Sequence, residues 1–114
     1  LPRVARAADD AETHWNNGVS LYGEGDYPAS LVEFKRAYEI QPNYNFLYNI
    51  GQVYWTLKDY VSAVKTYQQY LTDGGARIGA TRRGEVEKDI ASGKGRIATV
   101  TITVPPAPFL LTAA

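Results

Sequence analysis

The chain of 114 residues contains no cysteine and one histidine, His14. Without cysteine there is no disulfide, no thiol nucleophile and no cysteine-based metal site. A Ser–His pair would have to use His14, and no serine stands in a Gly-x-Ser-x-Gly sequence. The sequence therefore predicts a protein that is not an enzyme and that holds no metal or other cofactor.

Net charge and long apolar runs are also missing. Twelve basic and twelve acidic residues cancel, which argues against a broad attraction to nucleic acid or to an anionic membrane surface. No stretch of eighteen apolar residues is present, so we expect no direct membrane insertion. Residues 76–114 are mildly basic, with six bases and three acids, and we interpret this as a solvated face.

Two stretches of the chain resemble each other at an offset of 33 residues. The run "WNNG" at 15–18 corresponds to "YNIG" at 48–51, and the pair "DY" occurs at 26–27 and at 59–60. Apolar residues in both stretches follow three- and four-residue spacings, which predicts amphipathic helices. Gly, Pro, Asn and Asp residues separate these helices. The internal period predicts two copies of one helical hairpin.

Each copy resembles a tetratricopeptide repeat, a pair of antiparallel helices with small and aromatic residues at set positions. The matching residues of the first copy are Gly18, Leu21, Gly25, Asp26, Tyr27, Ser30, Phe34, Ala37 and Pro42. Those of the second copy are Ile50, Gly51, Tyr54, Asp59, Tyr60, Ala63 and Tyr67. Two positions depart from the pattern, since Ser30 and Tyr70 stand where alanine is usual.

The resemblance implies an all-α fold of two tandem hairpins, at about 11–43 and 44–75, plus a capping helix at about 76–91. This helical domain would span residues 9–92 and follow a flexible leader at 1–8. We expect Gly18 and Gly51 to let neighbouring helices approach closely, with an aromatic ring filling the remaining space. The capping helix should turn three apolar side chains inward, those of Ile78, Val86 and Ile90.

A single β-strand tail is predicted after the helices. Residues 98–104, "ATVTITV", alternate apolar β-branched residues with threonine, a strand pattern. The passage from a charged helix into this run resembles the junction with a PEGA-type β-sandwich in bacterial envelope proteins, although the naming motif is absent. Residues 96–114 would then be the truncated start of a second domain. An unpaired strand invites pairing, so a homo-oligomer through 98–104 is expected.

The same resemblance implies that the first helix of each repeat lines a concave groove that binds a peptide or partner segment. The candidate peptide-binding residues are Trp15, Asn16, Val19, Tyr22, Tyr48, Asn49, Gln52 and Trp55. Asparagine offers both a donor and an acceptor to a peptide backbone, and the aromatic side chains are typical of binding hot spots. Aromatic residues at helical spacing are equally typical of a core. The place of Trp15 and Trp55 therefore stays open, whereas Tyr54, Tyr60 and Tyr67 are predicted to be core residues.

The sequence thus predicts a non-catalytic protein–protein interaction module, a scaffold or docking unit with a protein or peptide partner. The tail resemblance and a run at 5–10 that resembles a signal-peptide cleavage site favour a bacterial envelope assembly, with the cytoplasm as the alternative compartment. The alternative function is a structural self-association unit. In that case its own C-terminal tail would occupy the groove or the edge strand.

Overall fold

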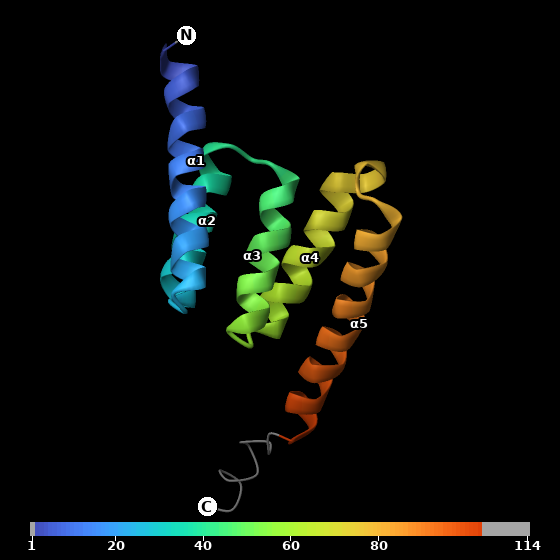
Figure 1. Cartoon of the computed structure of the whole chain (residues 1–114). Helices are drawn as coiled ribbons and strands as arrows, with labels where there is room; N and C mark the ends of the chain where they lie inside the picture. The colour runs from blue at the N-terminus through green and yellow to red at the C-terminus, as the bar shows by residue number, and fades with distance from the viewer. Residues whose placement is uncertain (1, 104–114) are drawn as a thin grey trace, which may run out of the picture.

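The computed structural model describes the backbone of residues 2–103 and the side chains of residues 10–98. The elements are α1 (Pro2–Gly23), α2 (Tyr27–Ile40), α3 (Tyr44–Thr56), α4 (Tyr60–Gly74), a 3₁₀ turn η1 (Gly75–Arg77) and α5 (Ala80–Thr103). In Figure 1, α1 pairs with α2, α3 pairs with α4, and α5 lies along α4. The predicted order of two helical hairpins and a further helix is confirmed. All regular secondary structure in the described part of the chain is helical.

Three predicted boundaries differ from the structure. The first helix begins at Pro2, so residues 2–8, which were expected to form a leader before the helices, are part of α1. The last helix begins at Ala80, after η1, and it continues to Thr103 instead of ending near residue 91.

The predicted strand is not found among the described residues, because residues 98–103 form the last turns of α5. A lone strand would leave its backbone N–H and C=O groups unpaired, whereas a helix pairs them internally. The strand preference of valine, isoleucine and threonine depends strongly on such neighbours. The rest of the predicted tail, residues 104–114, lies outside the described residues.

Aspartates one repeat apart start the second helix of each hairpin. The carboxylate of Asp26 accepts a hydrogen bond from the backbone N–H of Ala29 at 3.2 Å, and that of Asp59 accepts one from Ser62 at 3.1 Å. These bonds satisfy amide groups that have no partner inside the helix. The equivalent turns therefore follow from equivalent local sequence.

Each hairpin is closed by an aromatic ring that lies on a glycine. A Cβ atom added to Gly18 would lie 2.5 Å from the ring of Phe34, and one added to Gly51 would lie 2.5 Å from the ring of Tyr67. The expected close approach at both glycines is thus confirmed. Ser30, which departs from the usual alanine, is fully buried and donates a hydrogen bond to the Gly18 carbonyl oxygen at 2.7 Å, so its hydroxyl does not stay unpaired in the core.

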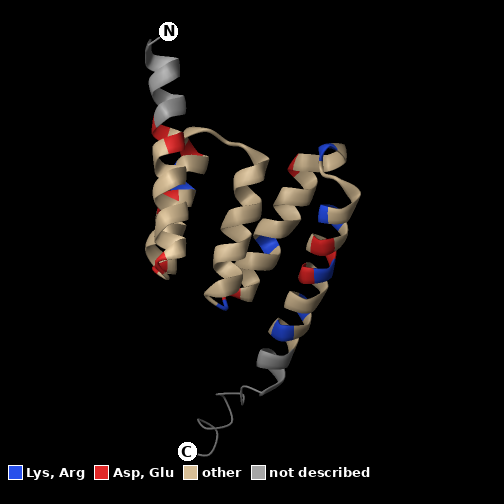
Figure 2. Cartoon of the chain, in the orientation of Figure 1, with Lys and Arg blue, Asp and Glu red and all other residues tan. Residues whose placement is uncertain are grey.

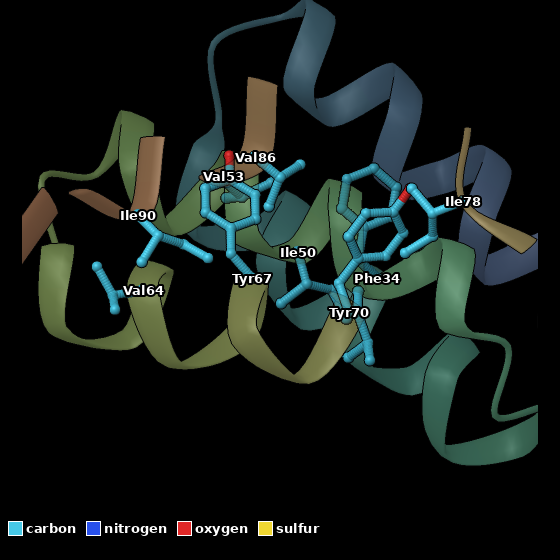
Figure 3. Close-up of a cluster of buried hydrophobic side chains, with 10 residues drawn as sticks. Phe34, Ile50, Val53, Val64, Tyr67, Tyr70, Ile78, Val86 and Ile90 are labelled. Atoms are coloured by element: carbon cyan, nitrogen blue, oxygen red, sulfur yellow. The ribbon is translucent and has the colours of Figure 1, made fainter. Parts of the chain in front are cut away.

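The core runs without a break from the first hairpin to α5. Figure 3 shows side chains of α2, α3, α4 and α5 in one cluster, which comprises Phe34, Leu47, Ile50, Val53, Val64, Tyr67, Tyr70, Ile78, Val86 and Ile90. The three residues expected to point inward from the capping segment are all members. A hairpin cannot bury both of its faces alone, and α5 covers the side of the second hairpin that faces away from the first.

We expect Gly51→Ala to lower the free energy of unfolding by about 1–3 kcal/mol, because the added methyl group overlaps the buried Tyr67 ring. Gly84→Ala is the matched control, since a Cβ at Gly84 would have no atom within 4 Å. That substitution should raise stability by up to about 1 kcal/mol through helix propensity alone. Urea denaturation measures both changes, and equal effects would contradict the ring-on-glycine contact.

The turn between α3 and α4 places a lysine in the left-handed region. Lys58 has φ 63°, and Gly25, one repeat earlier, has φ 86°. Because a side chain is strained there, Lys58→Gly should raise the free energy of unfolding by about 0.5–1 kcal/mol. Lys65→Gly, at an exposed site inside α4, should lower it by about 1 kcal/mol. Thermal denaturation tests the pair, and a loss of stability in Lys58→Gly would refute the strain.

Candidate functional site

Two adjoining hollows lie along α1 and α3, the first helices of the hairpins, and the second hollow also reaches α5. The first, of about 190 Å³, is lined by Val19, Tyr22, Phe34, Asn49, Gln52 and Val53. The second, of about 230 Å³, is lined by Tyr22, Gln52, Trp55, Thr56, Tyr67 and Asp89. Tyr22 and Gln52 line both, so the hollows form one continuous surface, which we call the groove.

Hydrogen bonds fix the residues that the two hollows share. The hydroxyl of Thr56 donates to the Gln52 carbonyl oxygen at 3.0 Å, so the Tyr22 hydroxyl, 3.0 Å away on α1, donates to Thr56. The amide nitrogen of Gln52 donates to the Tyr48 hydroxyl at 3.2 Å. The bond between Tyr22 and Thr56 holds α1 to α3 across the groove. Asn49 lines the first hollow, and among the described residues its side-chain amide has no hydrogen-bond partner.

The groove is neutral along α3 and charged along α5. Helix α3 contains no charged residue, and Figure 2 shows α3 without charge and α5 with residues of both signs. Two arginines of α5 lie on aromatic rings: the Arg82 guanidinium is 4.0 Å from the centre of the Tyr48 ring, and that of Arg96 is 5.6 Å from the centre of Trp55. Such cation–π contacts hold α5 against α3.

Asp89 brings a carboxylate to the second hollow. It lies seven residues from each of these two arginines along α5, and it is half-buried beside Tyr67. Burial raises the pKa of the Tyr67 phenol well above its ordinary value, and the negative charge of Asp89 raises it further. The phenol therefore stays neutral at the wall of the groove.

Five of the eight predicted peptide-binding residues line the groove, namely Val19, Tyr22, Asn49, Gln52 and Trp55. The other three line neither hollow. Trp15 is half-buried, with its ring centre 4.6 Å from that of Phe34 and 4.8 Å from that of Phe46, so it packs α1 onto α2 and α3.

The other two residues outside the hollows are Tyr48 and Asn16. The Tyr48 ring packs on Tyr67 and Tyr70 at 6.2 and 5.5 Å. Asn16 is exposed, so of the two equivalent asparagines only Asn49 lies in a hollow. Of the predicted core tyrosines, Tyr67 is buried, whereas Tyr54 and Tyr60 are half-buried.

The sequence prediction missed Asp89, which lies in the segment 76–114 that is interpreted as a solvated face. A signal for it exists, because Asp89 follows Thr56 by the same 33 residues that separate the two hairpins. Carrying the repeat into the last helix places Asp89 where α3 has a groove residue. Tyr67 was assigned to the core, and it is both buried and part of the wall of the second hollow.

Other polar features lie outside the groove. His14 Nδ1 lies 2.5 Å from a carboxylate oxygen of Glu33, which links α1 to α2. A hollow of about 550 Å³ at the α2–α3 connection includes Arg77, whose guanidinium lies 4.4 Å from the centre of the Tyr44 ring.

Within residues 2–103, no helix has the length and apolar character needed to cross a membrane. The described side chains also contain no group of three or more acidic, histidine or cysteine residues that could hold a metal ion.

The stacked hairpins and the groove between their first helices define a helical-repeat module. Residues 44–72, which comprise α3 and most of α4, match the model of the tetratricopeptide repeat family, and the predicted repeat is confirmed there. Over 62 residues the chain is similar to BBSome complex member BBS4 from Mus musculus and Bos taurus, at 37% identity, and from Xenopus tropicalis, at 34%.

The matched segment is 53% of this chain but 12% of each of these relatives. The chain therefore spans a small part of their length. None of these matches supports the resemblance of the tail to a PEGA-type domain.

The raised pKa of Tyr67 predicts the sign of a pH effect. Above about pH 10 the unfolded chain loses the phenol proton while the folded chain keeps it. The free energy of unfolding should therefore fall as the pH rises, by up to about 1.4 kcal/mol per pH unit for this group. Tyr67→Phe has no proton to lose, so its stability should fall less steeply. Urea denaturation at several alkaline pH values compares the two slopes, and parallel slopes would contradict the prediction.

Proposed function

We propose that the chain is a protein–protein interaction module whose groove binds an extended segment of a partner protein. Tetratricopeptide repeats generally mediate protein–protein interactions. The observation that carries the proposal is the unused amide of Asn49 beside that of Gln52, on a helix without charge and between the aromatic side chains of Tyr22 and Trp55.

An extended peptide presents backbone N–H and C=O groups along its length, and a side-chain amide can pair with both. Aromatic walls bury apolar surface and still offer polar edges. Each hollow is smaller than a usual small-molecule pocket, which has roughly 300–1,000 Å³. The shape thus suits single side chains of a segment that lies across α1, α3 and α5 better than an enclosed small ligand.

The similar proteins suggest what kind of partner the groove would bind. They are named as members of a complex, and we propose by analogy that the partner of this chain is another subunit of an assembly. The bacterial envelope setting finds no support in these vertebrate relatives, so the proposal does not include it. The alternative of a groove occupied by the chain's own tail concerns residues beyond Thr103 and is an outcome of the test below.

Selection from a displayed library of random dodecapeptides tests the groove. Synthetic versions of the enriched peptides should bind in fluorescence anisotropy, and Asn49→Ala and Gln52→Ala should each weaken binding by about 5- to 30-fold through a lost hydrogen bond. Asn17→Ala and Gln68→Ala, at exposed sites outside the groove, are the matched controls and should change the affinity less than twofold.

Enriched peptides that tolerate both groove substitutions as well as the controls would refute the groove. A chain ending at residue 103 separates the alternative occupant. If the tail fills the groove, this shortened chain should bind the peptides more tightly than the full chain does, and its solution mass by light scattering should fall if the tail links two copies.

A further inference from the structure

The second hollow of the groove contains a carboxylate without a counter-charge. Asp89 is half-buried there, and among the described residues no ion pair or hydrogen bond of its side chain is found. It is the one charged residue lining either hollow in the described part of the chain. A half-buried carboxylate without a protein partner is available to a cation from outside the chain.

Three arginines of α5 lie within seven residues of Asp89, and each has another partner. Arg83 donates a hydrogen bond to the Gly75 carbonyl oxygen. Arg82 lies over Tyr48, and Arg96 lies over Tyr60 at 5.1 Å from the ring centre and donates a hydrogen bond to its hydroxyl at 3.2 Å. Both are one heptad away from Asp89, about two turns of helix or roughly 10 Å along the axis. None of the three arginines therefore supplies the missing partner.

The other walls of this hollow suit a cation as well. Trp55 and Tyr22 contribute aromatic rings, which attract cations on their faces, and Arg96 already lies 5.6 Å from the centre of the Trp55 ring. Tyr67 contributes a neutral phenol, and Gln52 a side-chain amide. A carboxylate set among aromatic rings offers an ionic partner to a long basic side chain and apolar surface to its aliphatic stem.

We propose that this hollow binds a lysine or arginine side chain of the segment that occupies the groove, with Asp89 as its ionic partner. The inference rests on the proposed function and narrows it to a partner segment with a basic residue. The amides of Asn49 and Gln52 hold the backbone whatever its sequence, and Asp89 selects the charge. A segment that places an acidic side chain there is rejected by like-charge repulsion.

Blocked tripeptides test the charge preference without a known partner. The probes are acetyl-Ala-Arg-Ala-amide and its citrulline counterpart, which keeps the shape of arginine and lacks the charge. Nuclear magnetic resonance follows the two indole N–H signals. The Trp55 signal lies in the hollow, and the Trp15 signal, packed between two phenylalanines, is the internal reference.

The arginine probe should shift the Trp55 signal saturably and leave the Trp15 signal in place, and it should bind about 5- to 10-fold more tightly than the citrulline probe. Asp89→Asn should remove this preference. Glu87→Gln, which makes the same charge change at an exposed site of α5, should keep it.

Equal binding of the two probes to the unaltered chain overturns the inference, and this comparison needs no variant to fold. An unchanged preference in Asp89→Asn, or no shift of the Trp55 signal by either probe, also overturns it. The groove itself is judged by the dodecapeptide selection. Enriched peptides that need Asn49 and Gln52 but show no excess of lysine or arginine would leave the proposed function standing and refute only the role of Asp89.

Discussion

The contact between an aromatic ring and a glycine underlies the rest of the structure. At Gly18 and Gly51 the absent side chain makes room for Phe34 and Tyr67, which brings the two helices of each hairpin together. Because the contact recurs after 33 residues, the two hairpins have one internal geometry and can stack in one register. The groove is a consequence of that register, since it lies between helices that occupy equivalent places in successive hairpins.

Helix α5 has a double role that neither hairpin could fill. Its apolar side, with Val86 and Ile90, closes the core of the second hairpin. Gly84 is the equivalent of Gly18 and Gly51 one repeat later, yet no ring of the described residues lies on it. The last helix therefore behaves as the first helix of a third unit and leaves its outer side polar. Its groove side adds charge next to the uncharged α3, so the helix that caps the fold also sets the electrostatics of the groove.

The sequence predicted part of the candidate site and not all of it. Tyr22, Asn49, Gln52 and Trp55 were placed by the repeat offset, because a fixed period carries a residue to the same face of each first helix. Asn16 has the same offset but lies in neither hollow. In the described chain, the hollow beside Asn49 forms against α1, and Asn16 has no earlier first helix beside it. Neighbours across the stack, which local sequence does not specify, decide this difference.

The sequence by itself determined the hairpins: glycines, N-cap aspartates and apolar spacings act within a few residues, and each signal is present twice. Where two residues have similar local sequence, only the tertiary structure decided whether each is packed between helices or lines a hollow. Trp15 is packed between helices while Trp55 also lines a hollow. Residues 98–103, with a strand pattern, continue a helix that already pairs its own backbone. The burial of a side chain and the hydrogen bonding of a strand depend on which distant segment packs alongside. The arrangement of the stacked helices decides this, and the local sequence does not.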